Sequence, residues 1–423
     1  MERLNDDQLQ AYEIIMSGIN TFITGAGGCG KSFLVKVLIE KFEAMGKIVG
    51  VTSTTGISAL PLRGKTIHSW AGIGLGDKDA LELLKKVRRN SKAKKNWLIS
   101  SVLIIDEISM MPPDLFTKLE FIGRAIRGNQ LPFGGIQILV SGDMAQLPPV
   151  KTDSYCFNAV VWDTTIQYVA HLKKNMRQKE ELFQRVLNNV RFGIVNDEVR
   201  EVLSSRVNAN VGTELIKPTK LFSLKVDVEE VNQQELRKLL SPENNVVRYR
   251  ARDDYKAPNI LPKETLMEYT AYVNKNCQGR EVLDLAVGAQ VMLIVNLDVD
   301  AGLVNGSRGV VIRFEEHRPV VRFMNGLEII VAAHIWEIEI NEYVTAIRFQ
   351  VPLILSYSLT THKCQGATLD CVDLDLGDSI FAAGQFYTAL SRVRTLEGLS
   401  ISELNFDKII ADPQVVEYYS KFD

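Results

Sequence analysis

Two groups of residues have the types and spacing that nucleotide chemistry requires. The first is the glycine-rich segment Gly25-Ala-Gly-Gly-Cys-Gly-Lys31-Ser32, which fits the pattern GxxxxGK[ST]. Glycines leave room for backbone N–H groups to surround phosphate oxygens. Lys31 would reach the β- and γ-phosphates, and Ser32 would hold Mg²⁺. The backbone cradle comprises Gly25, Gly27, Gly28, Cys29 and Gly30.

The second group is the acidic pair Asp106-Glu107, directly after the apolar run 102–105. Such a run is typical of a strand in a sheet covered on both faces. Asp106 would position Mg²⁺ and its waters, and Glu107 would orient and deprotonate the attacking water. The alternative is a solvated pair of turn carboxylates. Downstream of a phosphate-binding loop, the first interpretation is favoured.

The elements around these groups predict an α/β fold. An apolar run at 19–24 precedes the glycine-rich segment, and a helical pattern at 31–38 follows it. This strand–turn–helix context separates a phosphate-binding loop from an ordinary glycine-rich turn. Further strands are expected at 48–53 and 136–140. The strand–turn–helix units therefore predict a parallel, doubly wound lobe.

Three other positions in this lobe carry polar groups that could face a ligand. Gln146 follows the strand at 136–140, where its amide could sense a γ-phosphate. Thr55-Gly56 lies at the carboxyl end of a strand, where open α/β sheets bind ligands. Gln8 lies three residues after Asn5 in a helix expected over 5–18. It could complete a capping box or read the adenine edge, and the residues alone leave these alternatives level.

Two arginines are candidates for stabilising charge on a transferred phosphoryl group. Arg177 follows the first lobe, and Arg392 lies in a helical segment near the end of the chain. An arginine aimed at the γ-phosphate speeds phosphoryl transfer by orders of magnitude. Arg394 is the less favoured neighbour, because residues two apart on a helix face differently. The alternative for any of these arginines is a surface salt bridge.

The pattern of expected helices and strands changes twice in the second half of the chain. Helices are expected at 180–193, 196–205 and 228–240, with a strand at 220–224. From about residue 251, short strands and the turn signals Asn305-Gly306 and Asn325-Gly326 predict a small antiparallel barrel. The α/β pattern returns with strands at 353–357 and 372–376. The barrel is therefore expected as an insert within an α/β frame.

Composition narrows the class of protein. The chain has 423 residues, of which 46% are hydrophobic and 24% charged, as in soluble proteins of about two to four domains. No apolar run is long enough to span a membrane, and the polar start predicts no signal peptide. Five cysteines without a CxxC pair suggest a reducing compartment, with neither a disulfide framework nor a zinc site.

Charge is distributed unevenly along the chain. The formal net charge of −2 argues against a nucleic-acid coat protein, so a polyanion would be held in a local groove. One segment is strongly basic and contains no acid. Its cations are Lys85, Lys86, Arg88, Arg89, Lys92, Lys94 and Lys95. This segment is either a solvated helix face and loop or a phosphate contact.

Taken together, the segments resemble the petite-integration-frequency family of superfamily-one DNA helicases over nearly the whole chain. Besides the groups above, two motifs carry the resemblance more specifically than the phosphate-binding loop does. They are Phe133-Gly134-Gly135 and Gly302-Leu-Val-Asn-Gly-Ser-Arg-Gly309, and Thr361-His362-Lys363-Cys364-Gln365-Gly366 matches as well. The segment from Tyr387 to Arg392 also matches.

The resemblance implies two RecA-like parallel-sheet lobes, with ATP and Mg²⁺ between them and single-stranded DNA across both. The first lobe would hold a short strand-separating wedge, and the second a small SH3-like β-barrel. The implied boundaries are 1–60 and 77–170 for lobe one, 61–76 for the wedge, 171–250 and 353–423 for lobe two, and 251–352 for the barrel.

The resemblance also implies roles for individual residues. Gln8 would contact the adenine, Gln146 would sense the γ-phosphate, and Arg177 and Arg392 would be arginine fingers. Gly366 is assigned to the nucleotide site. The residues expected near DNA are Thr55, Gly56, His68, Trp70, Thr361 and His362. For Trp70, the alternative to stacking or wedging is a small local core.

The chain departs from the family pattern at two places. Gly27-Gly28-Cys29 replaces the usual Ala-Gly-Thr, with mild expected effects because these positions act through backbone N–H groups. Thr54 and Ser58 replace a proline and an alanine, so the DNA contact of that loop is less certain. Cys29, at a helix N-terminus beside Lys31, is either a reactive thiol or a packed, inert one.

The expected activity is ATP-dependent 5′-to-3′ translocation on single-stranded DNA, which separates duplex, or a G-quadruplex, ahead of the protein. The expected partners are single-stranded and forked DNA and no membrane, and the free protein is expected to be a monomer. We expect the protein to reside in a bacterial cytoplasm or to be viral. A nuclear or mitochondrial location is expected only if the protein is targeted there by other means. Rival hypotheses are an ATP-toggled single-strand clamp, an RNA-directed helicase and a nuclease.

Overall fold

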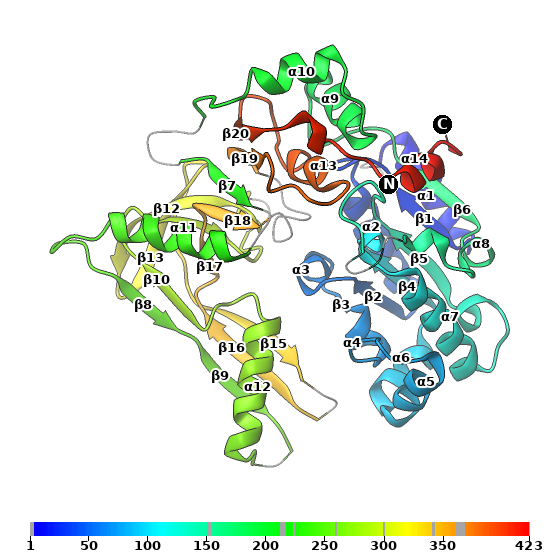
Figure 1. The fold of residues 1–423 in the computed structure, drawn as a ribbon. Coiled ribbons are helices and arrows are strands. Elements are labelled where there is room, and N and C mark those ends of the chain that lie inside the picture. Colours follow the sequence, from blue (N-terminus) through cyan, green and yellow to red (C-terminus); the bar gives the residue numbers. More distant parts are fainter. Residues whose placement is uncertain are drawn as a thin grey trace. The chain divides into compact units, whose positions relative to one another are not determined.

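The computed structural model describes residues 4–149, 152, 154–211, 217–222, 225–258, 260–298, 301–340, 343–360 and 369–422. These residues form two compact units (Figure 1). The first unit combines Met1–Leu203 with Ile380–Ser391 and Asn405–Asp423. The second unit combines Ser204–Ser379 with Arg392–Leu404. The chain therefore crosses between the units three more times after residue 203.

A six-stranded sheet forms the centre of the first unit. Its order is β3-β2-β4-β5-β1-β6, and every pairing is parallel. The strands are β1 (Thr21–Thr24), β2 (Val49–Ser53), β3 (Lys65–Thr66), β4 (Val102–Asp106), β5 (Gln137–Ser141) and β6 (Tyr168–His171). All five residues of β4 are buried, which confirms the sheet covered on both faces that its apolar run predicted.

Helices cover both faces of this sheet because successive strand residues point in opposite directions. Ile23 of β1 packs in one core cluster with residues of α1 and α2. Its neighbour Phe22 contacts Trp162 of α8, and Trp162 contacts Phe116 of α7. The helices of the unit are α1 (Asp6–Met16), α2 (Lys31–Ala44), α3 (Gly56–Ala59), α4 (Ile67–Ala71), α5 (Ala80–Arg89), α6 (Ser91–Ile99), α7 (Pro113–Arg127), α8 (Trp162–Thr165), α9 (Glu181–Arg191), α10 (Asp197–Ser204), α13 (Gln385–Leu390) and α14 (Pro413–Tyr419).

The segment expected to be a wedge, 61–76, forms regular structure within the first unit. It contains the end of a 3₁₀ turn (Leu60–Leu62), the edge strand β3 and helix α4. Strand β3 pairs in parallel with β2 and is therefore an edge strand of the central sheet. Trp70 of α4 is 6% exposed and packs edge-on against Trp97 of α6, with 4.8 Å between ring centroids.

The second unit contains a four-stranded parallel sheet with the order β18-β7-β19-β20. Its strands are β7 (Thr219–Phe222), β18 (Ser358–Thr360), β19 (Val372–Leu376) and β20 (Leu399–Leu404). Helix α11 (Lys225–Lys238) packs beside β7 and β18, through a hydrogen bond from Asn232 Nδ2 to Ser358 O of 2.9 Å. The return of the α/β pattern is therefore confirmed at 372–376. The strand expected at 353–357 is instead β17 (Leu353–Leu355), which pairs antiparallel with a strand of the insert, and the parallel sheet takes β18 just after it.

An antiparallel sheet of five strands, ordered β14-β13-β12-β11-β17, forms the main part of the predicted insert. The strands are β11 (Gln290–Leu293), β12 (Arg308–Glu315), β13 (Arg318–Phe323), β14 (Glu328–Ile330) and β17 (Leu353–Leu355). Asn325-Gly326 joins β13 to β14, with Gly326 at φ +86°, as the turn signal predicted. The turn from β12 to β13 is formed by Glu316-His317, both at positive φ. These two residues are not a usual turn signal, so this turn was not predicted.

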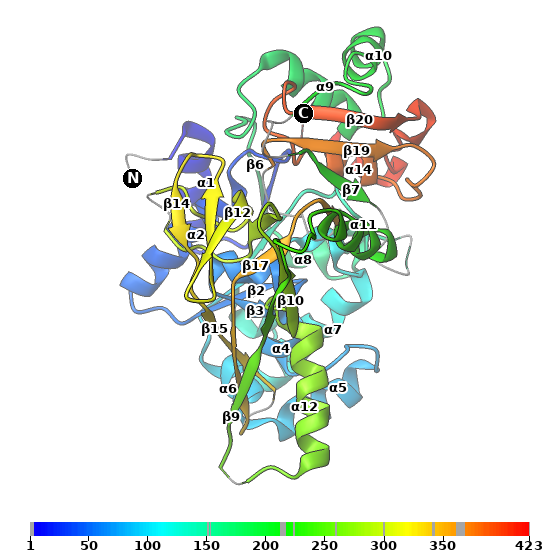
Figure 2. The ribbon, with the colours of Figure 1, turned by 90° about the vertical axis from the view of Figure 1, so that its left-hand side faces the viewer.

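The insert also contains strands outside that sheet. Strand β15 (His334–Glu339) pairs in a separate sheet with β16 (Thr345–Gln350) and β9 (Arg252–Lys256). Helix α12 (Lys263–Asn276) lies along this sheet (Figure 2), and Tyr255 of β9 bonds its Thr270. A two-stranded pair joins β8 (Val247–Arg250) to β10 (Val282–Leu285).

In the part of the chain that the structure describes, no helix combines the length and the apolar character that a bilayer crossing requires.

Candidate active site

Three adjacent strands lead to polar groups at one edge of the first unit's sheet. The phosphate-binding loop follows β1, Asp106 ends β4, and Asp143 follows β5. Strand β5 lies between β4 and β1, and all three run in parallel. Their carboxyl ends therefore meet, which is where open α/β sheets hold ligands.

The loop requires glycine for both conformation and space. Gly28 and Gly30 adopt φ of +94° and +84°, and Gly25 adopts +144°. A Cβ atom on Gly28 would lie 2.7 Å from Cβ of Arg177, and one on Gly25 would lie 2.3 Å from Leu172 O. Other residue types would disturb this backbone, so the loop can take this conformation only with glycine at these positions.

Lys31 begins α2 and folds back over the loop. Its Nζ donates to Gly25 O at 2.7 Å and to Ala26 O at 3.1 Å. Ser32, the next residue, is exposed at the start of the same helix. The loop and the helix N-terminus together place cationic and N–H groups where a phosphate chain would bind.

Asp106 and Glu107 differ in environment. Asp106 is buried, and this burial, with the charge of Glu107, raises its pKa to about 7 against the opposing effect of Lys31. A divalent cation would stabilise such a poorly solvated carboxylate, and Asp106 and Ser32 offer the hard oxygen ligands that Mg²⁺ prefers. Glu107 has φ +54°, a strained conformation often found at functional sites.

The two glutamines lie against the phosphate-binding loop. Gln8 completes the capping box with Asn5, and its Nε2 also donates to Gly30 O at 3.3 Å. The capping and nucleotide-contact interpretations are therefore compatible in one side chain. A Cβ atom on Gly27 would lie 3.5 Å from Nε2 of Gln146, so this amide also reaches the loop.

The arginine candidates fall in different compact units. Arg177 lies in the first unit, where its Nη1 donates to Ser391 O at 2.8 Å and its Cβ lies beside Gly28. Arg392 lies in the second unit, directly after α13, and is 2% exposed. Arg394 forms a surface ion pair of 2.9 Å with Asp370, the alternative that applies to any lone arginine. The finger roles and the lobe boundaries stay predictions.

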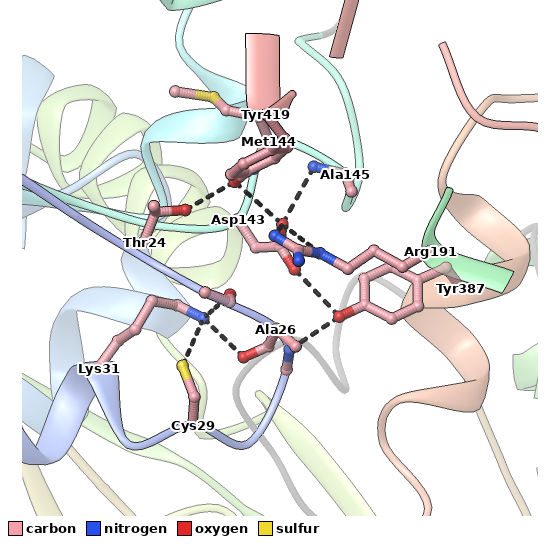
Figure 3. Close-up of polar contacts among 12 residues, drawn as sticks. Thr24, Ala26, Cys29, Lys31, Asp143, Met144, Ala145, Arg191, Tyr387 and Tyr419 are labelled. Carbon is pink, nitrogen blue, oxygen red and sulfur yellow. Dashed lines mark hydrogen bonds and ion pairs between the residues drawn. The ribbon is translucent and has the colours of Figure 1, made fainter. Parts of the chain in front are cut away.

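A buried polar network behind the loop was not predicted (Figure 3). Asp143 accepts hydrogen bonds from Arg191 of α9, Tyr387 of α13 and Tyr419 of α14. Tyr387 Oη also accepts the N–H of Gly27 at 2.8 Å. One carboxylate thus connects three helices to the backbone of the phosphate-binding loop.

The network is electrostatically balanced. Burial favours the neutral form of Asp143, but the charges of Arg191 and Lys31 outweigh burial and lower its pKa. Burial and the charge of Asp143 raise the pKa of the Tyr387 and Tyr419 hydroxyls, which stay protonated and donate. A buried ion pair with satisfied hydrogen bonds favours one arrangement of its helices.

The residues expected near DNA have mixed outcomes. Thr55 and Gly56 begin α3, and Thr55 Oγ1 accepts the N–H of Ser58 at 3.2 Å. His68 is half-buried in α4, and burial lowers its pKa. The burial of Trp70 against Trp97 and Gly50 matches the local-core alternative, because no ring face is free to stack on a base. Thr361, His362 and Gly366 lie outside the described residues.

The residues that depart from the family pattern have structural roles. Thr54 Oγ1 donates to Glu107 O at 3.0 Å, and Ser58 Oγ lies 2.6 Å from Ser53 Oγ. The 53–58 loop is therefore bonded to the backbone of the acidic pair. Cys29 is fully buried in the α1–α2 core, which favours the packed, inert interpretation of its thiol.

Arg191, Tyr387 and Tyr419 are the site residues that sequence reasoning missed. Arg191 lies in a helix with an ordinary amphipathic pattern, and Tyr419 lies in the last helix of the chain. In the sequence of a helix, an arginine that will be buried looks the same as one that will lie on the surface. No sequence signal therefore indicated the ion pair between Arg191 and Asp143.

A parallel sheet with a glycine cradle, a lysine and an acidic pair at the carboxyl ends of adjacent strands defines a P-loop nucleotide-binding protein. The comparisons narrow this class. The model of the PIF1-like helicase family matches residues 3–201, and that of the DNA helicase Pif1 2B domain matches residues 268–314. The chain belongs to the PIF1-like helicase family, and its two parallel sheets are those of RecA-like lobes.

Known proteins resemble the chain over its whole length. It is 36% identical to human ATP-dependent DNA helicase PIF1 over 99% of the chain. The Pif1 helicase structure from Candida albicans matches with a TM-score of 0.82 at 35% identity, covering 100% of both chains. Pif1 of a Bacteroides species, solved with ADP-AlF4, matches with a TM-score of 0.81 at 30% identity, covering 99% and 97%. The same helicase has also been solved bound to single-stranded DNA.

The match to the human protein does not extend over that protein's full length. The chain covers 64% of it, and 64% of the Xenopus laevis relative. The shared region therefore corresponds to about two thirds of these relatives.

Proposed function

We propose that the protein is an ATP-dependent DNA helicase that moves 5′ to 3′ along single-stranded DNA and separates duplex ahead of it. The observation that carries this proposal is the meeting of Lys31, Asp106-Glu107 and Gln146 at one sheet edge of a PIF1-like chain.

The first unit supplies the hydrolysis chemistry. The loop amides and Lys31 would bind the phosphates, and Mg²⁺, when held by Ser32 and Asp106, would neutralise phosphate charge. Glu107 would orient the attacking water and take its proton. Gln146 would respond to the γ-phosphate, and Gln8 would contact the base. The nucleotide in the Bacteroides structure supports this assignment by family likeness.

A hydrogen-bonded loop offers a route from DNA to this chemistry. Thr55, the residue expected to contact the strand, is next to Thr54, whose hydroxyl bonds the backbone of Glu107. A DNA strand that shifts this loop would change the orientation of the Glu107 carboxylate. This arrangement would make hydrolysis depend on single-stranded DNA.

The remaining features of the proposal come from the family resemblance. ATP would draw Arg177 and Arg392 to the γ-phosphate, and hydrolysis would release them, so that two grips on the DNA backbone alternate. Forked DNA is the proposed substrate, a G-quadruplex an additional one, and the free protein a monomer. The compartment stays a prediction.

Unwinding of duplexes with either a 5′ or a 3′ single-stranded tail tests the proposal. The wild type should unwind only the 5′-tailed duplex, with ATP turnover stimulated by single strands. Lys31→Ala should abolish both activities, because the charge on the phosphates is lost. DNA binding toggled by ATP without turnover would instead identify a clamp, and unwinding from the 3′ tail would contradict the direction.

A further inference from the structure

The strongly basic segment of the first unit is an exposed surface on two joined helices. Helix α5 ends and α6 begins at the same residue, Asn90 (Figure 1). All seven cations of the segment are exposed. We call this surface the α5–α6 patch, and its members are Lys85, Lys86, Arg88, Arg89, Lys92, Lys94 and Lys95.

Helical periodicity places the patch and the buried apolar residues on opposite faces of the two helices. Leu83, Leu84 and Val87 of α5 are buried, as are Ala93 and Trp97 of α6. The cations occupy the opposite faces. Burial of the apolar faces therefore holds two arrays of positive charge in a fixed position on the surface.

The two helices of the patch carry a single acid, Glu82 in the first turn of α5, and it pairs with Lys78 at 3.5 Å. Residues 83–99 contain no Asp or Glu, although the whole chain has a net charge of −2. Among the described residues, Lys85, Arg88, Arg89, Lys94 and Lys95 take part in none of the ion pairs that the structure shows. The neighbouring carboxylates Asp114 and Glu120 of α7 pair with Lys118 and Arg124 of the same helix.

Local helix stability explains only part of this charge. Lys86, Arg88 and Arg89 lie in the last turn of α5, where cations favourably oppose the helix dipole. Lys92 and Lys94 lie near the start of α6, where cations are disfavoured and where this helix has no acid. The patch thus retains charge that its own helix does not favour.

We propose that the α5–α6 patch binds the phosphate backbone of duplex DNA, as a second contact besides the single-strand path. This inference rests on the proposed helicase function, which provides a duplex at the fork. The patch concentrates cations without an exposed aromatic side chain, since Trp97 is buried. Single-strand sites combine cations with stacking aromatics, whereas duplex backbone binding needs cations alone.

The composition also favours nucleic acid over an acidic protein. Five of the seven cations are lysines, a residue depleted in protein–protein interfaces. Helix α5 alone spans about 15 Å, a length over which duplex DNA presents roughly nine phosphates. The spacing of the patch therefore suits several simultaneous phosphate contacts.

A charge-neutralised variant tests the patch against a matched control. The patch variant changes Lys85, Arg88, Arg89, Lys94 and Lys95 to Gln, which keeps good helix formers on exposed positions. The control variant changes five scattered exposed lysines to Gln and so alters the net charge equally. These lysines are Lys36, Lys41, Lys263, Lys275 and Lys421.

Binding to a blunt duplex and to an oligothymidylate is measured across a salt series. The patch variant should lose about tenfold or more in duplex affinity, with a salt slope shallower by about one unit for each phosphate contact removed. Its affinity for oligothymidylate and its single-strand-stimulated ATP turnover should stay within about twofold of wild type.

Each other outcome overturns the patch proposal. Equal loss of duplex affinity in both variants would indicate long-range charge alone. Loss of oligothymidylate affinity would indicate a single-strand contact, and unchanged duplex affinity would leave a solvated helix face. A wild type without stimulated ATP turnover would contradict the proposed helicase function, whatever the duplex result, so the two failures are distinguishable.

Discussion

At the scale of single residues, one phenolic hydroxyl links the phosphate-binding loop to the helix that precedes Arg392. Tyr387 Oη accepts from Gly27 N and donates to Asp143 at 3.0 Å. Tyr419 belongs to the same network but contacts Thr24, Met144 and Asp143, and not the glycine-rich loop. The two tyrosines therefore provide a matched pair for separating stability from nucleotide binding.

We expect Tyr387→Phe to raise the KM for ATP several-fold and to lower the free energy of unfolding by about 1–3 kcal/mol. The change leaves the Gly27 N–H and an Asp143 oxygen without a buried partner. Steady-state kinetics and denaturant titration measure the two effects. Tyr419→Phe should lower stability similarly with the KM for ATP unchanged, and a comparable rise in its KM would contradict a specific role for Tyr387.

At the scale of secondary-structure elements, α4 is a core element of the first unit. A Cβ atom on Gly50 would lie 2.8 Å from the indole of Trp70, and Asn96 Nδ2 donates to Trp70 O at 2.9 Å. The helix is thus packed against β2 and bonded to α6. Its tryptophan stabilises the sheet edge that carries the 53–58 loop.

We expect Trp70→Phe to lower the free energy of unfolding by about 1–3 kcal/mol, because a smaller ring leaves a cavity beside Trp97 and Gly50. Affinity for single-stranded DNA should stay within about twofold, since the ring is not available to a base. Denaturant titration and fluorescence anisotropy measure these effects. Leu75→Ala, at a position 78% exposed, is the control and should change neither quantity. A selective loss of DNA affinity in Trp70→Phe would restore the stacking hypothesis.

The helices α9, α13 and α14 meet at Asp143, and their network predicts how stability depends on pH. The lowered pKa of Asp143 gives stability that is present above its unfolded pKa of about 4 and is lost as pH falls through the folded value. The raised pKa of Tyr387 and Tyr419 gives stability that is present below about pH 10 and is lost as pH rises further.

Denaturant titrations across the pH range, with intrinsic fluorescence as the probe, measure this dependence. The alkaline decline should become shallower in Tyr419→Phe, which removes one buried phenol, and the acid decline should be unaffected. An alkaline decline as steep as that of wild type would show that the phenols of the network do not contribute.

At the scale of the whole molecule, the proposed motor needs a residue from each compact unit. The phosphate-binding loop, Glu107 and Arg177 belong to the first unit, whereas Arg392 belongs to the second. Arg392 follows α13 by two residues, so the chain leaves the first unit directly before it. A change at this arginine tests whether the second unit takes part in hydrolysis.

We expect Arg392→Ala to lower kcat for ATP about 10³-fold while nucleotide affinity changes only a few-fold, because a finger arginine acts mainly on transition-state charge. Single-turnover hydrolysis and nucleotide titration separate the two quantities. Arg394→Ala, which removes only the exposed pair with Asp370, should stay within about twofold of wild type. Equal effects of the two substitutions on kcat would show that Arg392 has no specific role in hydrolysis.

Most of the local structure could be predicted from the residues. The glycine-rich loop, the strands around it and the acidic pair follow from patterns within a few positions, because turn geometry and strand burial depend on near neighbours. Sheet partners could not be predicted. The strand expected at 353–357 in the α/β frame pairs in the antiparallel sheet, and the 61–76 segment supplies an edge strand of the central sheet. Both points concern which distant segment is the partner.

Residue patterns alone predict the nucleotide chemistry and the alternation of α/β and antiparallel segments. The folded chain was needed to show that Trp70 is buried by Trp97, that Asp143 pairs with Arg191, and that Tyr387 reaches Gly27 across 360 positions. Burial and long-range hydrogen bonding depend on which segments the fold brings together. No local pattern encodes that pairing.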